Sequence, residues 1–143
     1  MSTLITVLKM PTIGLLAIIL VALIFQRVMI QLDTVRYPAT GELVDVGGHR
    51  LHFRVMGTQN NLPTVVLEAG NGGFSSQWIR VQTALAEHTQ VVSYDRAGFG
   101  WSDTDTQARD LARNAEQLHA GLEQLGIEPP YILVGHSMGV RLH

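Results

Sequence analysis

An apolar segment near the end of the chain runs directly into a serine that is flanked by two glycines. The segment is Tyr131–Val134, and the residues after it form a G-x-S-x-G pattern from Gly135 to Gly139. Small residues two positions before and two positions after the serine leave room for a tight, strained turn between a strand and a helix. Strands that alternate with helices form parallel sheets covered by helices. This feature therefore predicts an α/β fold.

The segments before this turn predict the same class of fold. Alternating or continuous apolar runs indicate strands, and apolar residues spaced at i, i+4 and i+7 indicate helices. In chain order, the expected elements are strands at 42–46 and 51–55 joined by Gly47-Gly48, a strand at 64–68, a helix at 77–87, a strand at 90–94, a helix at 106–125 that ends before Gly126, and a strand at 131–135. An antiparallel hairpin followed by β-α-β-α-β predicts about five strands, of which the later ones are parallel.

The first 30 residues are strongly apolar. Between Leu4 and Phe25 the only charge is Lys9, and residues 13–25 carry no polar side chain. This length predicts a membrane-spanning helix, which Arg27 can lengthen because its long side chain reaches the membrane interface. A cleaved signal peptide and a buried helix of a soluble protein are the alternatives, although no small-residue cleavage site follows Phe25.

We therefore expect three parts along the chain. They are a single-pass transmembrane anchor at 1–32, a linker at 33–41 that contains Pro38 and Gly41, and a truncated α/β domain at 42–143. The expected localisation is the membrane. Basic residues lie on both sides of the apolar segment, so the side of the membrane that holds the domain stays open.

Composition excludes several classes of function. The formal net charge is −2 at pH 7 and only 15% of the residues are charged, so we expect no nucleic-acid partner. The chain has no cysteine. This absence excludes disulfides, thiol catalysis and thiolate metal sites.

Ser137 is the candidate nucleophile, because a strained strand-to-helix turn exposes the serine hydroxyl. The N–H of Met138, at the start of the following helix, is one candidate donor to the oxyanion that forms when the serine attacks an electrophilic carbon. The second donor is expected in the glycine-rich loop after the strand at 64–68. There we expect the Asn71 N–H to serve, with Gly72 as the alternative.

Two other interpretations of these loops remain open. Gly70, Gly72 and Ser75 approximate the G-x-G-x-x-G/A pattern of dinucleotide-binding folds. However, the third glycine is missing, and that pattern normally follows the first strand of its fold rather than the third. A serine between two glycines also occurs in ordinary βα turns that carry no chemistry.

A second segment, Tyr94–Ser102 with the sequence YDRAGFGWS, resembles the segment after the fourth strand in the α/β-hydrolase superfamily. Together with the serine turn, it makes about residues 42–143 similar to the N-terminal part of that fold. The resemblance implies an eight-stranded, mostly parallel sheet of which strands one to five are present. It also implies a serine hydrolase of the esterase or lipase type that forms an acyl-enzyme with a small ester-like substrate. Such enzymes use a Ser-His-Asp/Glu triad and need no metal or organic cofactor.

The chain departs from the superfamily pattern at two places. Many relatives have His-Gly where this chain has Ala69-Gly70, a change that backbone donors tolerate. Many also have a second glycine where Val140 stands, and a valine there crowds the helix against the strand. A serine at the turn, rather than an aspartate, argues against the dehalogenase and epoxide-hydrolase branches.

Other polar residues have structural interpretations. We expect Asp95 to pair with Arg96 or to cap backbone N–H groups, and His136 to point away from Ser137 in a packing or hydrogen-bonding role. His143 lies on a different helical face from Ser137, so we do not expect it to be the catalytic base. Four further histidines fall on predicted polar faces and are expected to be solvated: His49, His52, His88 and His119.

No Asp or Glu follows Ser137, and His143 is the only histidine after it. In turns of this type the acid and the histidine follow the nucleophile along the chain. We therefore expect this chain to be a fragment of a longer protein. The fragment is expected to be inactive as a triad hydrolase and to have an open apolar edge at its last strand. The alternatives are a catalytically inactive, membrane-tethered remnant or binding module, and an acyltransferase that uses the same turn. The substrate and the oligomeric state stay open.

Overall fold

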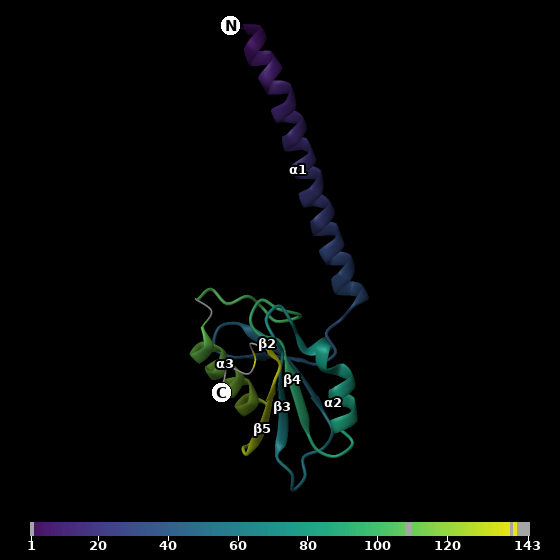
Figure 1. Cartoon of the computed structure of the whole chain (residues 1–143), viewed down its shortest axis with the longest axis vertical. Coiled ribbons are helices and arrows are strands. Elements are labelled where there is room, and N and C mark those ends of the chain that lie inside the picture. Colours follow the sequence, from purple (N-terminus) through teal and green to yellow (C-terminus); the bar gives the residue numbers. More distant parts are fainter. Residues whose placement is uncertain (1, 108–109, 138, 140–143) are drawn as a thin grey trace. The chain divides into compact units, whose positions relative to one another are not determined.

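The computed structural model describes residues 2–107, 110–137 and 139. The chain divides between Pro38 and Ala39 into two compact units, and each is described by itself. The first unit is a single long helix and the second is a small α/β domain (Figure 1).

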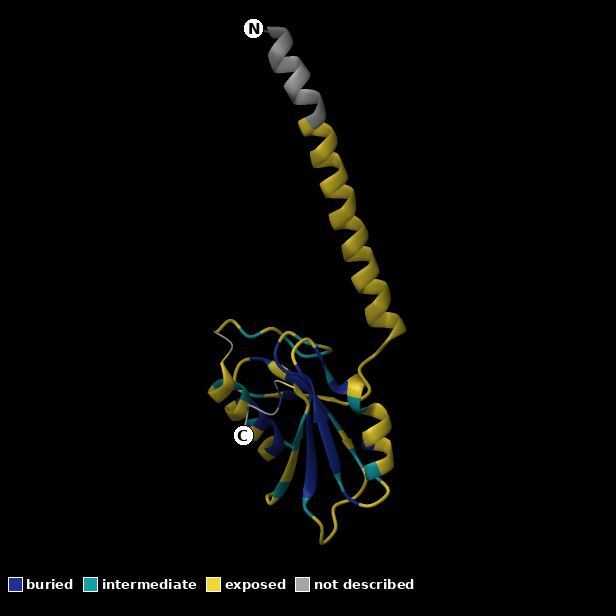
Figure 2. Ribbon diagram, in the orientation of Figure 1, coloured by how far each residue is buried: buried dark blue, intermediate teal, exposed yellow. Residues whose placement is uncertain are grey.

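Helix α1 spans Ser2–Arg36. Its segment Thr12–Arg36 is long and apolar enough to cross a membrane, a property that some signal sequences and soluble core helices share. All residues of this segment are exposed (Figure 2). The helix extends into the segment that was predicted to be a linker, because no proline or glycine lies between Gly14 and Pro38. That proline disfavours a helical conformation at Tyr37 and so ends the helix.

The described residues of the domain form a five-stranded sheet with the order β1-β2-β4-β3-β5. Its strands are β1 (Glu42–Asp45), β2 (Arg50–Met56), β3 (Thr64–Glu68), β4 (Val91–Tyr94) and β5 (Tyr131–Gly135). The pairs β1/β2 and β2/β4 are antiparallel, whereas β3 is parallel to both β4 and β5. The predicted hairpin followed by parallel strands is therefore confirmed.

The helices of the domain begin differently from the predicted ones. The expected helix at 77–87 is a 3₁₀ turn, η1 (Ser75–Trp78), followed by α2 (Ile79–Leu85). The expected helix at 106–125 begins only with α3 (Leu111–Gln124), because the Asp110 side chain accepts a hydrogen bond from the Arg113 N–H (2.7 Å) and caps the helix there. Gly126, with a φ of +66°, follows its end as predicted.

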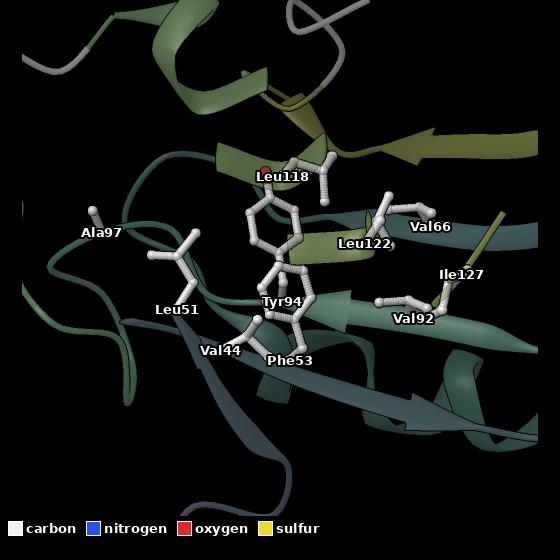
Figure 3. Close-up of a cluster of buried hydrophobic side chains, with 10 residues drawn as sticks. All are labelled: Val44, Leu51, Phe53, Val66, Val92, Tyr94, Ala97, Leu118, Leu122 and Ile127. Carbon is white, nitrogen blue, oxygen red and sulfur yellow. The ribbon is translucent and has the colours of Figure 1, made fainter. Parts of the chain in front are cut away.

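Two apolar clusters hold these elements together, one on each face of the sheet. In the first, the ring of Phe53 stacks on that of Tyr94 at 5.5 Å, and Leu118 and Leu122 of α3 pack against them (Figure 3). The second contains Val65, Leu67 and Val91, with Trp78 and Leu85 from η1 and α2 packed against it. Alternate residues of β3 thus enter opposite clusters, as the pleat of a strand requires. The result is a sheet with α3 on one face and α2 on the other.

Strand β5 lies at the edge of the sheet. Ile132 and Leu133 are 49% and 42% exposed. Within the described residues, the predicted open apolar edge is therefore present.

Candidate active site

The backbone turns sharply at Ser137, two residues after the end of β5. Ser137 has a φ of 55°, and among the described residues it is the only one other than glycine with a positive φ. This left-handed conformation costs a residue with a side chain on the order of 1–3 kcal/mol, so the surrounding structure must hold it. The residue is exposed. A strained turn thus presents a serine at the carboxyl end of a strand.

Close neighbouring atoms explain why glycines lie in and beside this turn. A Cβ at Gly139 would lie 2.7 Å from Cγ and 2.8 Å from the carbonyl oxygen of Glu68, at the end of the adjacent strand β3. A Cβ at Gly70 would lie 3.0 Å from Nδ1 of His136 and 3.3 Å from Cβ of Ser137. The loop after β3 therefore passes directly against the serine turn, because parallel β3 and β5 end at the same edge of the sheet.

The loop itself is a tight turn from Gly70 to Gly73. The Gly73 N–H donates to the Gly70 carbonyl oxygen at 3.1 Å, and Gly72 has the positive φ, +73°, that a type II turn requires at its third residue. Asn71 is exposed. Within the described part of the chain, no hydrogen bond uses its N–H.

Three predicted positions lie outside the described residues: Met138, Val140 and His143. The expected Met138 N–H donor, the crowding at Val140 and the expectation for His143 therefore stay predictions. Ser137 and Asn71, in contrast, both belong to described loops at the same edge of the sheet.

A buried ionic cluster, which the residue pattern did not predict, lies beneath the loop. Glu68 is 1% exposed. Arg96 Nη1 lies 3.2 Å from one of its carboxylate oxygens, and the Tyr94 hydroxyl donates to the other. Arg96 Nη2 donates to the Gly70 carbonyl oxygen. The available signal was a glutamate that ends an otherwise apolar buried strand, Thr64–Glu68.

The electrostatics of this cluster are set by burial. Burial raises the pKa of Glu68 to about 7, although the hydrogen bond from Tyr94 and the charge of Arg96 act in the opposite direction. Burial, and then the negative charge and hydrogen bond of Glu68, raise the pKa of Tyr94 well above its ordinary value. The tyrosine therefore remains a proton donor.

Asp95 is fully buried and caps backbone N–H groups, which confirms one of its two predicted roles. Its carboxylate accepts from the N–H groups of Ser75 (2.6 Å) and Trp101 (3.0 Å) and from Nδ1 of His52 (3.0 Å). Burial alone would raise the pKa of Asp95, but these hydrogen bonds together lower it below its usual value. The predicted pairing of Asp95 with Arg96 is wrong, because Arg96 pairs with Glu68.

Two of the four histidines that were expected to be solvated are buried. His52 is 0% exposed because its ring lies between Asp95 and Trp101, whose ring centroid is 5.0 Å away. His49 is 9% exposed, with Nε2 4.0 Å from a carboxylate oxygen of Asp105. His88 and His119 are exposed, as predicted.

His136 is exposed, and its side chain lies beside the loop and lines a small cavity. The cavity has a volume of about 280 Å³ and is also lined by Gln77 and Trp78 of η1 and by Val81 of α2. Its walls are therefore formed partly by apolar side chains next to the serine turn.

Comparisons with known proteins agree with this geometry. The chain is 36% identical over 105 residues to the Hormonema carpetanum protein named "Probable transporter efuK", covering 70% of this chain and 15% of that protein. It resembles the enol-lactonase from Burkholderia xenovorans LB400 with a TM-score of 0.63 and 28% identity, covering 68% of this chain and 38% of that one. It also resembles the epoxide hydrolase CorEH with a TM-score of 0.65 and 25% identity, covering 72% and 35%.

The chain thus spans less than half the length of each of these proteins. A model of the family described as alpha/beta hydrolase fold matches residues 63–142, which is more than half of this chain. The match includes β3, the loop after it, the buried cluster and the serine turn. The chain therefore belongs to the alpha/beta hydrolase fold family.

Proposed function

We propose that this domain supplies the nucleophile and the oxyanion donors of a serine hydrolase that acts on small ester-like substrates. The observation that carries the proposal is the strained, exposed Ser137, held against the glycine-rich loop after β3. In this mechanism the Ser137 hydroxyl gives its proton to a base while its oxygen attacks the ester carbonyl carbon. The C–O bond to the leaving alcohol then breaks, and the alcohol takes up the proton. Water hydrolyses the resulting acyl-enzyme, which releases the acid and restores the Ser137 hydroxyl. The N–H groups of Met138 and Asn71 donate hydrogen bonds to the oxyanion. These bonds stabilise the transition state because negative charge develops on that oxygen.

The nature of the nucleophile supports ester cleavage over epoxide opening. Structures of both a lactonase and an epoxide hydrolase resemble this chain, so the fold by itself does not separate the two chemistries. A serine attacking a carbonyl gives an acyl ester that an activated water can cleave. We therefore infer an esterase-like or lactonase-like reaction.

The reaction also needs a base and an acid. No Asp or Glu follows Ser137 in the sequence. The buried pair of His52, on β2, with Asp95, just after β4, is not available for this role, because the Asp95 carboxylate already accepts hydrogen bonds from two backbone N–H groups. We propose that residues 42–143 act as a truncated domain whose base and acid come from additional sequence. Alone, such a domain retains only a residual acceleration of about 10³–10⁴ over water.

We further propose that α1 anchors the domain in a membrane as a single-pass helix. Its apolar segment Thr12–Arg36 supports this proposal. We assign residues 1–32 to this anchor, and the residues around Pro38 to a short linker between the anchor and the α/β domain.

The first test reads the gene downstream of codon 143, where we expect an acidic residue and then a histidine in frame. The second test compares the 143-residue chain with that longer product in hydrolysis of p-nitrophenyl acetate and in labelling by a fluorophosphonate probe. We expect turnover and labelling in the longer product, both abolished by Ser137→Ala and unaffected by Ser76→Ala, which changes another exposed serine.

Two results would overturn the proposal. One is turnover by the longer product that survives Ser137→Ala. The other is a folded longer product that has the acid and the histidine but neither hydrolyses the ester nor takes up the probe, which would favour a binding module instead.

A further inference from the structure

Two donors from different parts of the fold hold the carbonyl oxygen of Gly70. One is the Gly73 N–H at 3.1 Å, from within the turn. The other is Nη2 of Arg96, from the loop after β4. A carbonyl oxygen has two lone pairs, so both are used and the carbonyl direction is determined from two sides.

Holding this carbonyl also orients the N–H of Asn71. The two groups belong to the same peptide unit, which is planar and trans, so the N–H points opposite to the C=O. The Gly70 carbonyl is turned toward Gly73 and Arg96, and the Asn71 N–H is therefore turned away from both. Among the described residues this N–H has no acceptor, and Gly70 lies against the Ser137 side chain.

Arg96 is itself held in place on three sides. Its side chain is 8% exposed, and Nη1 lies 3.2 Å from the Glu68 carboxylate. Its guanidinium lies over the ring of Phe99, 5.5 Å from the centroid. The planar fork of a guanidinium can contact Glu68 with one nitrogen and Gly70 with the other, which the single ammonium of lysine cannot reproduce. The carboxylate compensates the charge that burial would otherwise make costly.

We propose that Arg96, held by Glu68, is a positioning residue that orients the Gly70–Asn71 peptide so that the Asn71 N–H faces the oxyanion formed at Ser137. The inference rests on the proposed function and adds residues that touch neither the substrate nor the serine. The pairing explains why a glutamate ends the buried strand β3 and why an arginine follows β4.

The expected consequence is a loss of rate rather than of substrate binding. An oxyanion donor acts mainly in the transition state, and removing one such donor lowers kcat by about 10²–10³. A donor that is displaced by about 1 Å can cost about 10²-fold. We therefore expect Arg96→Met to lower kcat on the order of 10²-fold with little change in KM, and Arg96→Lys to show an intermediate loss.

The experiment uses the longer, active product described above, in detergent. Arg96→Met, Arg96→Lys and Glu68→Gln are compared with Arg80→Lys, a control at an exposed arginine on α2. The measurements are kcat and KM for p-nitrophenyl acetate, inhibition by a trifluoromethyl ketone that mimics the tetrahedral intermediate, and thermal unfolding. We expect affinity for the ketone to fall in parallel with kcat/KM, whereas the KM of the ester stays within about threefold.

If Arg96→Met does not fold, a measurement on the unsubstituted protein tests the same inference. Phenylboronic acid forms a tetrahedral adduct with a reactive serine, and NMR of the labelled protein then reports the Asn71 amide proton. We expect this proton to move downfield on adduct formation, and to do so less in Glu68→Gln.

The outcomes are distinguishable. If Ser137→Ala leaves turnover intact, the proposed function fails. If Ser137 is required but folded Arg96→Met keeps kcat within about threefold, the positioning inference is wrong and the function stands. An adduct at Ser137 that leaves the Asn71 proton unmoved would overturn the inference as well.

Discussion

The ionisation of Glu68 predicts an unusual pH dependence of stability. Because burial raises its pKa from 4.5 to about 7, the folded protein binds the Glu68 proton more tightly than the unfolded chain does. Its stabilising contribution is therefore complete below about pH 4.5 and is lost as the pH rises through 7. At about 1.4 kcal/mol per pKa unit, the free energy of unfolding should fall by about 2–3 kcal/mol between pH 5 and pH 8.

Glu68→Gln removes this titration and keeps the size and shape of the side chain. Between pH 5 and pH 8, we expect the unfolding free energy of the protein with Glu68 to fall by about 2–3 kcal/mol relative to that of Glu68→Gln. Urea unfolding of the full chain in detergent measures this difference. The unfolding is followed by the fluorescence of Trp78 and Trp101 at pH 5, 6, 7 and 8. A difference that is constant with pH, or that changes in the opposite direction, would refute the assignment of a protonated, buried Glu68 at pH 5.

Three further predictions test other parts of the chain. Leu122→Ala should lower the free energy of unfolding by about 2–5 kcal/mol, because this 2% exposed side chain fills the cluster between α3 and the sheet; urea unfolding measures the loss, and a value below about 1 kcal/mol would contradict the packing. Asp110→Ala should cost about 1 kcal/mol through loss of the helix cap, and amide exchange of the first turn of α3 should accelerate. The full chain should float with lipid vesicles after alkaline extraction, whereas a chain with Leu20→Asp and Ile24→Asp should not, since each charge costs about 3 kcal/mol at the bilayer centre; recovery of the unsubstituted chain in the soluble fraction would refute the anchor.

Local patterns predicted most of the architecture. The hairpin around Gly47-Gly48, the parallel strands and the end of α3 at Gly126 all follow from residue spacing and from the backbone preferences of glycine. The predicted start of α3 was wrong by five residues, because apolar spacing does not locate a helix cap, and Asp110 caps the helix directly before Leu111. Helix α1 extends to Arg36, beyond its predicted end at residue 32, because it continues until Pro38 disfavours a helical conformation at Tyr37.

The residue pattern alone shows that a serine follows an apolar strand at a glycine-flanked turn, and that a glycine-rich loop follows another strand. Both properties are local, since they depend on residue size and on backbone freedom within a few positions. Tertiary structure decided which side chains become partners. The adjacency of β3 to β4 brings Glu68 to Arg96, rather than leaving Arg96 to its neighbour Asp95. The pairing of β2 with β4 buries His52 against Asp95, and the adjacency of β3 to β5 places Gly70 against Ser137. Pairing energies between buried groups depend on distance and burial in three dimensions, and neither is encoded in the spacing of residues along the chain.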